Sequence, residues 1–237
     1  MRDNTPLNAY RYALYYAPAP DEPLAELGRQ WLGRDVHDDA RHPRPAVSGV
    51  PDARMDAIVA DACRYGLHAT LKAPFRLAPG RDPTELRRAL REFTVIRRNI
   101  TVPRLVLSDS LGFPALIPAE PCPTLNALAD DCVRVFDLFR ADLTPDELQR
   151  RQAAGLTAAQ KDHVLHWGYP YIFQDFRFHM TLAGPMDDPG ERQAVMTALR
   201  EHFAPVLDKP LQIRSICLFM EPEKGRPFRL FCRDRFG

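Results

Sequence analysis

Two stretches of this chain repeat each other and place a histidine and a threonine at the same spacing. Residues 68–74 and residues 179–185 both read H-x-T-L-x-x-P. In an extended strand successive side chains point to opposite faces, so a histidine and a threonine two positions apart share one face. Each copy is therefore expected to present an imidazole beside a hydroxyl.

Two such pairs suit the in-line cleavage of a phosphodiester. That reaction needs a base for the attacking oxygen, an acid for the leaving oxygen, and donors for the non-bridging oxygens. An imidazole with a pKa near 6.5 can fill either of the first two roles, and a hydroxyl can fill the third. The predicted catalytic residues are His68, Thr70, His179 and Thr181. The scheme requires no metal and no cofactor.

Three further residues are candidate substrate contacts. Lys72 and Arg177 fall on the same predicted strand faces as the histidines, where they would neutralise phosphate charge. Tyr15, in a short aromatic strand, is the third candidate. The alternatives are a solvated strand end for each cation and core packing for the tyrosine. One H-x-T alone could likewise be a half-exposed surface pair.

The repeat extends beyond the motif and predicts the elements that hold it. Strands are expected near 66–73 and 176–183, and each is followed by a D-P-x-E helix start at Asp82 or Asp188. An Asp N-cap, Pro at the first helical position and an early Glu favour a helix N-terminus. A β-branched stretch and another strand then follow in both copies. The pattern predicts a duplicated strand-helix-strand-strand unit within an α+β fold.

Two segments do not belong to the repeat. Residues 141–170 contain capping boxes that begin at Thr144 and Thr157, which predicts a helical insert. Residues 33–51 are rich in proline and have no hydrophobic period, so we expect a surface loop that could close over a ligand.

Composition limits the classes of function. The 237 residues are 45% hydrophobic and 27% charged, with a net charge of +1, and they are expected to form one soluble domain over 1–237. The near-neutral balance argues against duplex DNA or an anionic membrane as a partner. The sequence shows neither a membrane span of about 18 apolar residues nor a secretory signal, so a cytoplasmic location is expected. The absence of heptads makes a monomer the default.

Metal binding is not favoured by the remaining histidines and cysteines. His163 and His166 lie three apart on a predicted helix, but no carboxylate or cysteine supports them at ligand spacing. The five cysteines contain no C-x-x-C pair, which favours buried, reduced thiols.

These motifs resemble the two-histidine (2H) phosphoesterase superfamily, and the resemblance covers nearly the whole chain. Residues 11–18, 66–75 and 178–185 are similar to the branch associated with phosphonate-utilisation operons. The resemblance implies two pseudo-symmetric lobes, each a mostly antiparallel sheet with helices packed outside, around a central cleft. It also implies that the two histidines and two threonines are catalytic. The implied substrate is a small ribose cyclic phosphate, such as 5-phosphoribosyl 1,2-cyclic phosphate.

Two classes of function remain open from the sequence. The first is a metal-independent phosphodiesterase that acts on a small cyclic phosphate, with a 2'-5' RNA or nucleoside 2',3'-cyclic phosphate as the alternative substrate. The second is a non-catalytic module that binds a phosphorylated nucleotide or an RNA end in the same cleft. The intact motifs favour the enzyme. Because the two motifs are symmetric, the sequence does not assign the acid and the base.

Overall fold

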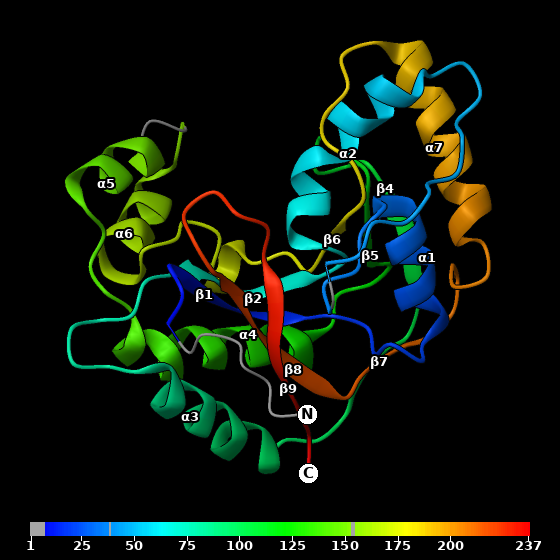
Figure 1. Ribbon diagram of the computed structural model, residues 1–237. Coiled ribbons are helices and arrows are strands. Elements are labelled where there is room, and N and C mark those ends of the chain that lie inside the picture. Colours follow the sequence, from blue (N-terminus) through cyan, green and yellow to red (C-terminus); the bar gives the residue numbers. More distant parts are fainter. Residues whose placement is uncertain (1–7, 38, 153–154) are drawn as a thin grey trace.

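The computed structural model describes residues 8–37, 39–152 and 155–237, and within them it shows an α+β fold with antiparallel sheets (Figure 1). The strands are β1 (Arg11–Tyr16), β2 (Ala69–Phe75), β3 (Ile100–Val102), β4 (Leu105–Ser108), β5 (Ala115–Pro118), β6 (Met180–Thr181), β7 (Leu211–Ile213), β8 (Ser215–Glu221) and β9 (Arg229–Arg235). The helices are α1 (Pro23–Leu32), α2 (Asp52–Tyr65), α3 (Pro83–Val95), α4 (Pro123–Phe136), α5 (Pro145–Gln152), α6 (Ala158–Trp167) and α7 (Pro189–Phe203). Short 3-10 turns are Asp137–Phe139 and Phe173–Asp175.

The largest sheet has the strand order β2-β1-β8-β9 and is buried on both faces in its centre. Alternate residues of β1, such as Tyr12 and Leu14, join the main hydrophobic core on the side of α3 and α4. The residues between them, Ala13 and Tyr15, join a smaller cluster with Phe219 on the opposite face. Burial on both faces explains why β1 and β8 read as continuous apolar runs.

Each motif strand pairs within a sheet that also contains a hairpin distant from it in the chain. β2, from the first copy, belongs to the sheet that contains the hairpin β8-β9 of the second copy. β6, from the second copy, extends the hairpin β4-β5 of the first in the order β4-β5-β6. β3 pairs with β7 in an antiparallel ladder. Each motif strand therefore lies at the edge of a sheet whose hairpin comes from the other copy.

The second motif strand is much shorter than the sequence pattern predicts. A strand over 176–183 was expected, but ladder pairing is confined to Met180–Thr181, which face Leu116 and Ala115 of β5. A 3-10 turn at Phe173–Asp175 precedes it. His179 therefore stands just before β6, as His68 stands just before β2.

The D-P-x-E sequences begin helices in both copies, as predicted. Asp82 caps α3 by accepting hydrogen bonds from the backbone N–H groups of Thr84 and Glu85. Asp188 caps α7 by accepting one from Glu191. These caps satisfy N–H groups that the helix itself leaves unpaired.

The segment expected to be a helical insert contains α5 and α6, which stand together beside the β1–β2 side of the large sheet (Figure 1). Thr144 and Glu147 exchange hydrogen bonds at the start of α5. Thr157 and Gln160 form the corresponding capping box at α6. Glu147 also pairs with Arg76, and Gln160 donates to Asp175, so each helix is joined to a neighbouring segment.

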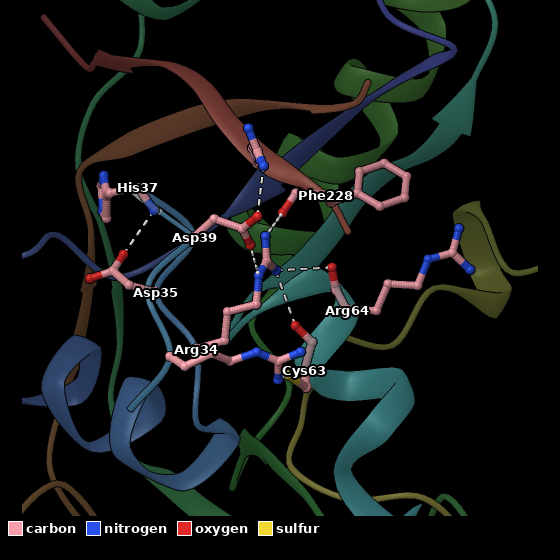
Figure 2. Close-up of polar contacts among 9 residues, drawn as sticks. Arg34, Asp35, His37, Asp39, Cys63, Arg64 and Phe228 are labelled. Atoms are coloured by element: carbon pink, nitrogen blue, oxygen red, sulfur yellow. Dashed lines mark hydrogen bonds and ion pairs between the residues drawn. The ribbon is translucent and has the colours of Figure 1, made fainter. Parts of the chain in front are cut away.

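A buried arginine fixes the end of α2, from which the chain enters the first motif. Figure 2 shows the Arg34 guanidinium among three carbonyl groups: those of Cys63 and Arg64, both at 3.1 Å, and that of Phe228 at 2.6 Å. Asp39 pairs with the same side chain. The orphan carbonyls at the helix C-terminus are thereby satisfied and joined to the start of β9.

The cysteines and the helices bear on two expectations from the sequence, which are reduced thiols and the lack of a membrane span. All five cysteines are free thiols, and four of them are buried. Among the described residues, no helix has both the length and the apolar character needed to cross a bilayer.

Candidate active site

His68 is held by the turn that joins α2 to β2. Gly66 ends the helix with a φ of 71°, a left-handed value that glycine adopts without a steric penalty. Its carbonyl lies 2.9 Å from Nδ1 of His68. Because a carbonyl oxygen only accepts, Nδ1 carries the hydrogen and Nε2 is left to meet a ligand.

Aromatic rings surround the imidazole of His68. Tyr15 lies 4.1 Å from it between ring centroids, and Tyr65 lies 5.5 Å away. Burial lowers the pKa of His68 to about 4; the hydrogen bond to Gly66 opposes this decrease and the nearby His179 adds to it. The ring is therefore neutral near pH 7.

His179 repeats this hydrogen bond in the second copy. Its Nδ1 lies 2.7 Å from the carbonyl of Arg177, again the residue two positions earlier. Phe113 meets the ring edge-on with a centroid distance of 5.7 Å. Burial lowers the pKa of His179 below 6.5, and the hydrogen bond to Arg177 opposes the decrease. In both histidines Nδ1 is thus bonded to a backbone carbonyl, and Nε2 is left to interact with a ligand.

One cavity of about 460 Å³ brings the two copies together. His68 and Thr70 line it from the first motif, and His179 and Thr181 from the second. Tyr15 also lines it, on the face of β1 opposite Tyr12. Five of the seven residues singled out in the sequence therefore border one space.

Lys72 does not lie in this cavity, and its predicted position is wrong. Thr70 pairs with Tyr15 but Lys72 pairs with Leu14, so β2 contains one extra residue at this point. Such a bulge reverses the alternation of side chains. The Lys72 ammonium therefore points to the core side, where it donates to the carbonyl of Val133 and pairs with Asp137 at 3.0 Å.

Arg177 also lies away from the cavity, contrary to the strand pattern. The chain forms no ladder at this position, so alternation with His179 does not apply. Its guanidinium donates to the carbonyls of Gln174 and Phe176, at 2.9 and 2.8 Å, and borders a separate cavity near Ile117. Only the main chain of Arg177 contributes to the site, through its bond to His179.

Several cavity residues were not expected from the sequence. Arg11 and Tyr65 come from β1 and α2. The segment 141–170 supplies Arg151 and Tyr169, and Tyr171 follows directly after it. Period-two alternation with Tyr15 could have indicated Arg11. No local pattern relates Arg151 to a motif so distant in the chain.

The loop expected to close over a ligand lies elsewhere. None of the described residues of 33–51 lines the cavity with the histidines. Instead, Arg34, Arg41 and Arg44 border a different cavity of about 570 Å³, which also touches α2.

The site offers proton transfer and anion binding through organic side chains. The two imidazoles can exchange protons, the two threonines can donate hydrogen bonds, and Arg11 and Arg151 add positive charge. Over residues 8–37, 39–152 and 155–237, no three His, Cys, Asp or Glu side chains converge as ligands for a metal would.

The structure therefore defines an α+β protein with two histidines in one cavity. The chain belongs to the family described as "Protein of unknown function (DUF1045)", whose sequence pattern matches residues 70–229.

Two curated relatives are longer proteins. "Ribose 1,5-bisphosphate phosphokinase PhnN" from Janthinobacterium sp. (strain Marseille) is 38% identical over 92% of this chain and 49% of its own length. The protein of the same name from Laribacter hongkongensis (strain HLHK9) is 36% identical over 94% of this chain and 51% of its own length. The chain thus spans about half the length of the curated relatives it matches.

A solved structure, that of Usb1 from Kluyveromyces marxianus, aligns over 91% of this chain and 96% of its own with 10% identity. The TM-score of this alignment is 0.38.

Proposed function

We propose that this protein is a metal-independent cyclic phosphodiesterase of the two-histidine type, acting on a small ribose cyclic phosphate. The observation that carries the proposal is the shared cavity, in which His68 and His179 each hold Nδ1 on a backbone carbonyl beside Thr70 or Thr181. A fixed tautomer leaves both Nε2 atoms for the reaction.

The surroundings of the two rings support a division of roles. A general base acts in its neutral form and a general acid in its protonated form. His68 has its pKa lowered to about 4, whereas the pKa of His179 is lowered by less. We therefore assign His68 as the base and His179 as the acid, which a bound phosphate anion would help to protonate.

The reaction balances with water as the nucleophile. Nε2 of His68 accepts a proton as the water oxygen bonds to phosphorus, and the bond from phosphorus to one ring-closing ester oxygen breaks. Nε2–H of His179 protonates that oxygen, which leaves as a sugar hydroxyl. Thr70 and Thr181 donate to the non-bridging oxygens. The product is a phosphomonoester on the neighbouring hydroxyl.

The names of the relatives support a ribose substrate. If the bond from phosphorus to O2 breaks, opening a 1,2-cyclic phosphate on ribose 5-phosphate gives ribose 1,5-bisphosphate, the molecule in the name of both relatives. The phosphokinase activity in that name is a property of proteins twice as long, and this sequence has no Gly-x4-Gly-Lys-Ser/Thr nucleotide loop. We place the reaction in phosphonate metabolism, just before such a kinase.

The same proposal extends to the architecture. We interpret the chain as one bilobal domain produced by duplication, with 141–170 as an insert and the catalytic cavity as the central cleft. The exchange of hairpins between the two copies supports this interpretation. Each motif strand then reaches the cavity from a different sheet.

A nucleoside 2',3'-cyclic phosphate is the second candidate substrate. Tyr171 borders the cavity and keeps 47% of its surface exposed, so a base could stack on it.

A substrate panel tests the proposal. Purified protein is assayed, with chelator present, on ribose 1,2-cyclic phosphate with and without a 5-phosphate and on nucleoside 2',3'-cyclic phosphates. We expect turnover of the ribose compounds and loss of about 10²- to 10⁴-fold in kcat for His68→Ala and His179→Ala. His166→Ala, on the exposed side of α6, is the matched control. Wild-type turnover in either catalytic variant would reject the assigned roles, and full inhibition by chelator would reject the metal-independent chemistry.

A further inference from the structure

Arg151 is a partly buried cation that borders the catalytic cavity and the cavity beside it. Its guanidinium donates to the carbonyl of Gly168 and lies 5.5 Å from the ring centroid of Tyr169. Within the described parts of the chain, no carboxylate forms an ion pair with it. Burial lowers the pKa of Arg151; Tyr169 and Glu147 oppose this decrease, and Arg11 adds to it. A cation in this setting favours an anionic ligand.

The adjoining cavity, of about 390 Å³, is lined mainly by positive charge. Its cations are Arg11, Arg64, Arg150, Arg151 and Lys224. Its two carboxylates are already engaged, since Glu147 pairs with Arg76 and Glu221 is held by Arg11 and Arg64. The positive charge therefore exceeds the negative charge.

Arg11 is a second cation that connects this charge to the catalytic cavity. Glu221 is completely buried and also accepts a hydrogen bond from the backbone N–H of Gly225. Because two guanidinium groups share this one carboxylate, the cluster of Arg11, Arg64 and Glu221 retains one positive charge. Arg11 and Arg151 are the two side chains that border both cavities.

We propose that Arg11 and Arg151 form a subsite for a second phosphate group of the substrate, next to the phosphate that is cleaved. This inference rests on the proposed cyclic phosphodiesterase activity and defines its substrate class: a sugar with a cyclic phosphodiester at one end and a phosphomonoester at the other. A phosphomonoester carries nearly two negative charges at neutral pH, and the guanidinium fork matches its oxygens.

The aromatic contacts and the charge distribution both favour a phosphomonoester over a strand of RNA. Tyr15 and Tyr65 turn ring faces toward His68, and Tyr65 also stacks on Phe228 at 4.8 Å. Those rings are occupied by protein partners, whereas recognition of a single strand uses successive free aromatic faces. The positive charge is also gathered in one cavity.

A charge-removing variant tests the subsite. KM and kcat are measured for wild type, Arg151→Met and Arg151→Lys on ribose 1,2-cyclic phosphate with and without a 5-phosphate. We expect Arg151→Met to raise KM for the phosphorylated substrate by about 10- to 100-fold more than KM for the other, since a charged hydrogen bond is lost from binding. Arg151→Lys should recover part of this difference. Arg88→Met, on the exposed side of α3, is the control.

The outcomes separate the two proposals. An equal change in KM for both sugars would reject the subsite and leave the phosphodiesterase intact. A larger loss with a dinucleotide that ends in a 2',3'-cyclic phosphate would show an RNA backbone site and also reject it. If wild type hydrolyses none of these compounds, the proposed function fails, and calorimetric titration of ribose 5-phosphate into wild type and Arg151→Met still tests the subsite. Equal affinities in that titration would reject it.

Discussion

Each of the two motif histidines makes the same kind of hydrogen bond, but the side chains around the two rings differ. Both histidines donate Nδ1–H to the carbonyl two positions earlier, but His68 lies against the two rings of Tyr15 and Tyr65 while His179 meets the edge of Phe113. The more enclosed ring loses more proton affinity. A repeated sequence thus supplies equal side chains, and their neighbours make them chemically unequal.

The largest expected effect distinguishes the base from the acid. A general acid matters less when the leaving group needs no proton, whereas a general base is still needed to activate water. On a p-nitrophenyl phosphodiester, His179→Ala should recover most of its lost kcat, and His68→Ala should remain about 10²-fold or more below wild type. If His68→Ala recovered its kcat and His179→Ala did not, the roles of base and acid would be exchanged. Equal recovery of kcat in both variants would show that the two histidines do not have separate roles.

A smaller effect should appear at the residue that carries the orienting carbonyl. In the first copy it is Gly66, where an added Cβ would stand 2.0 Å from Cγ1 of Val36. Gly66→Ala should therefore lower kcat as well as stability, because the carbonyl that holds His68 must shift. Gly80→Ala is the matched control, with a φ of 80° and open space around it. We expect Gly80→Ala to lose about 1–2 kcal/mol of stability in thermal melts, the cost of a positive φ for alanine. Gly66→Ala should lose more, because its φ of 71° with a ψ of 178° is a conformation nearly restricted to glycine and its Cβ would clash with Val36.

The double variant Gly66→Ala/Val36→Ala completes this test. Removing the Val36 methyl groups should restore kcat while the cost of the positive φ remains. If Gly66→Ala and Gly80→Ala have the same kcat, the turn does not position His68. Arg177 holds the corresponding place in the second copy with its side chain directed away, so no equivalent clash is expected there.

The effect that leaves kcat at neutral pH unchanged concerns stability in acid. The pKa of His68 is about 4 in the folded protein and about 6.5 when unfolded. Below pH 6.5 the unfolded state binds a proton that the folded state excludes, so the free energy of unfolding should fall between about pH 6.5 and pH 4, by at most about 1.4 kcal/mol per pH unit. His68→Gln should flatten this part of the curve more than His179→Gln, as measured by urea denaturation across that range. An unchanged slope in His68→Gln would show that its ring is not enclosed.

The predictable part of the site is the part that depends on local spacing. The four motif residues share a cavity, and the D-P-x-E sequences do begin helices, because caps and short strands obey rules that act over a few residues. Lys72 was misplaced because a single bulge reverses alternation, and nothing in the local sequence marks that bulge. Arg177 was misplaced because the strand is too short to impose any alternation.

By itself the sequence determined the α+β class, the repeated imidazole-hydroxyl pairs and the helix starts, since each depends on residue types at fixed local intervals. Only the tertiary structure decided that β2 and β6 meet across one cavity, that Arg11 and Arg151 join it, and that His68 is the more enclosed histidine. These features depend on contacts between segments far apart in the chain. Proton affinity and charge balance are properties of such surroundings, and residue type alone does not set them.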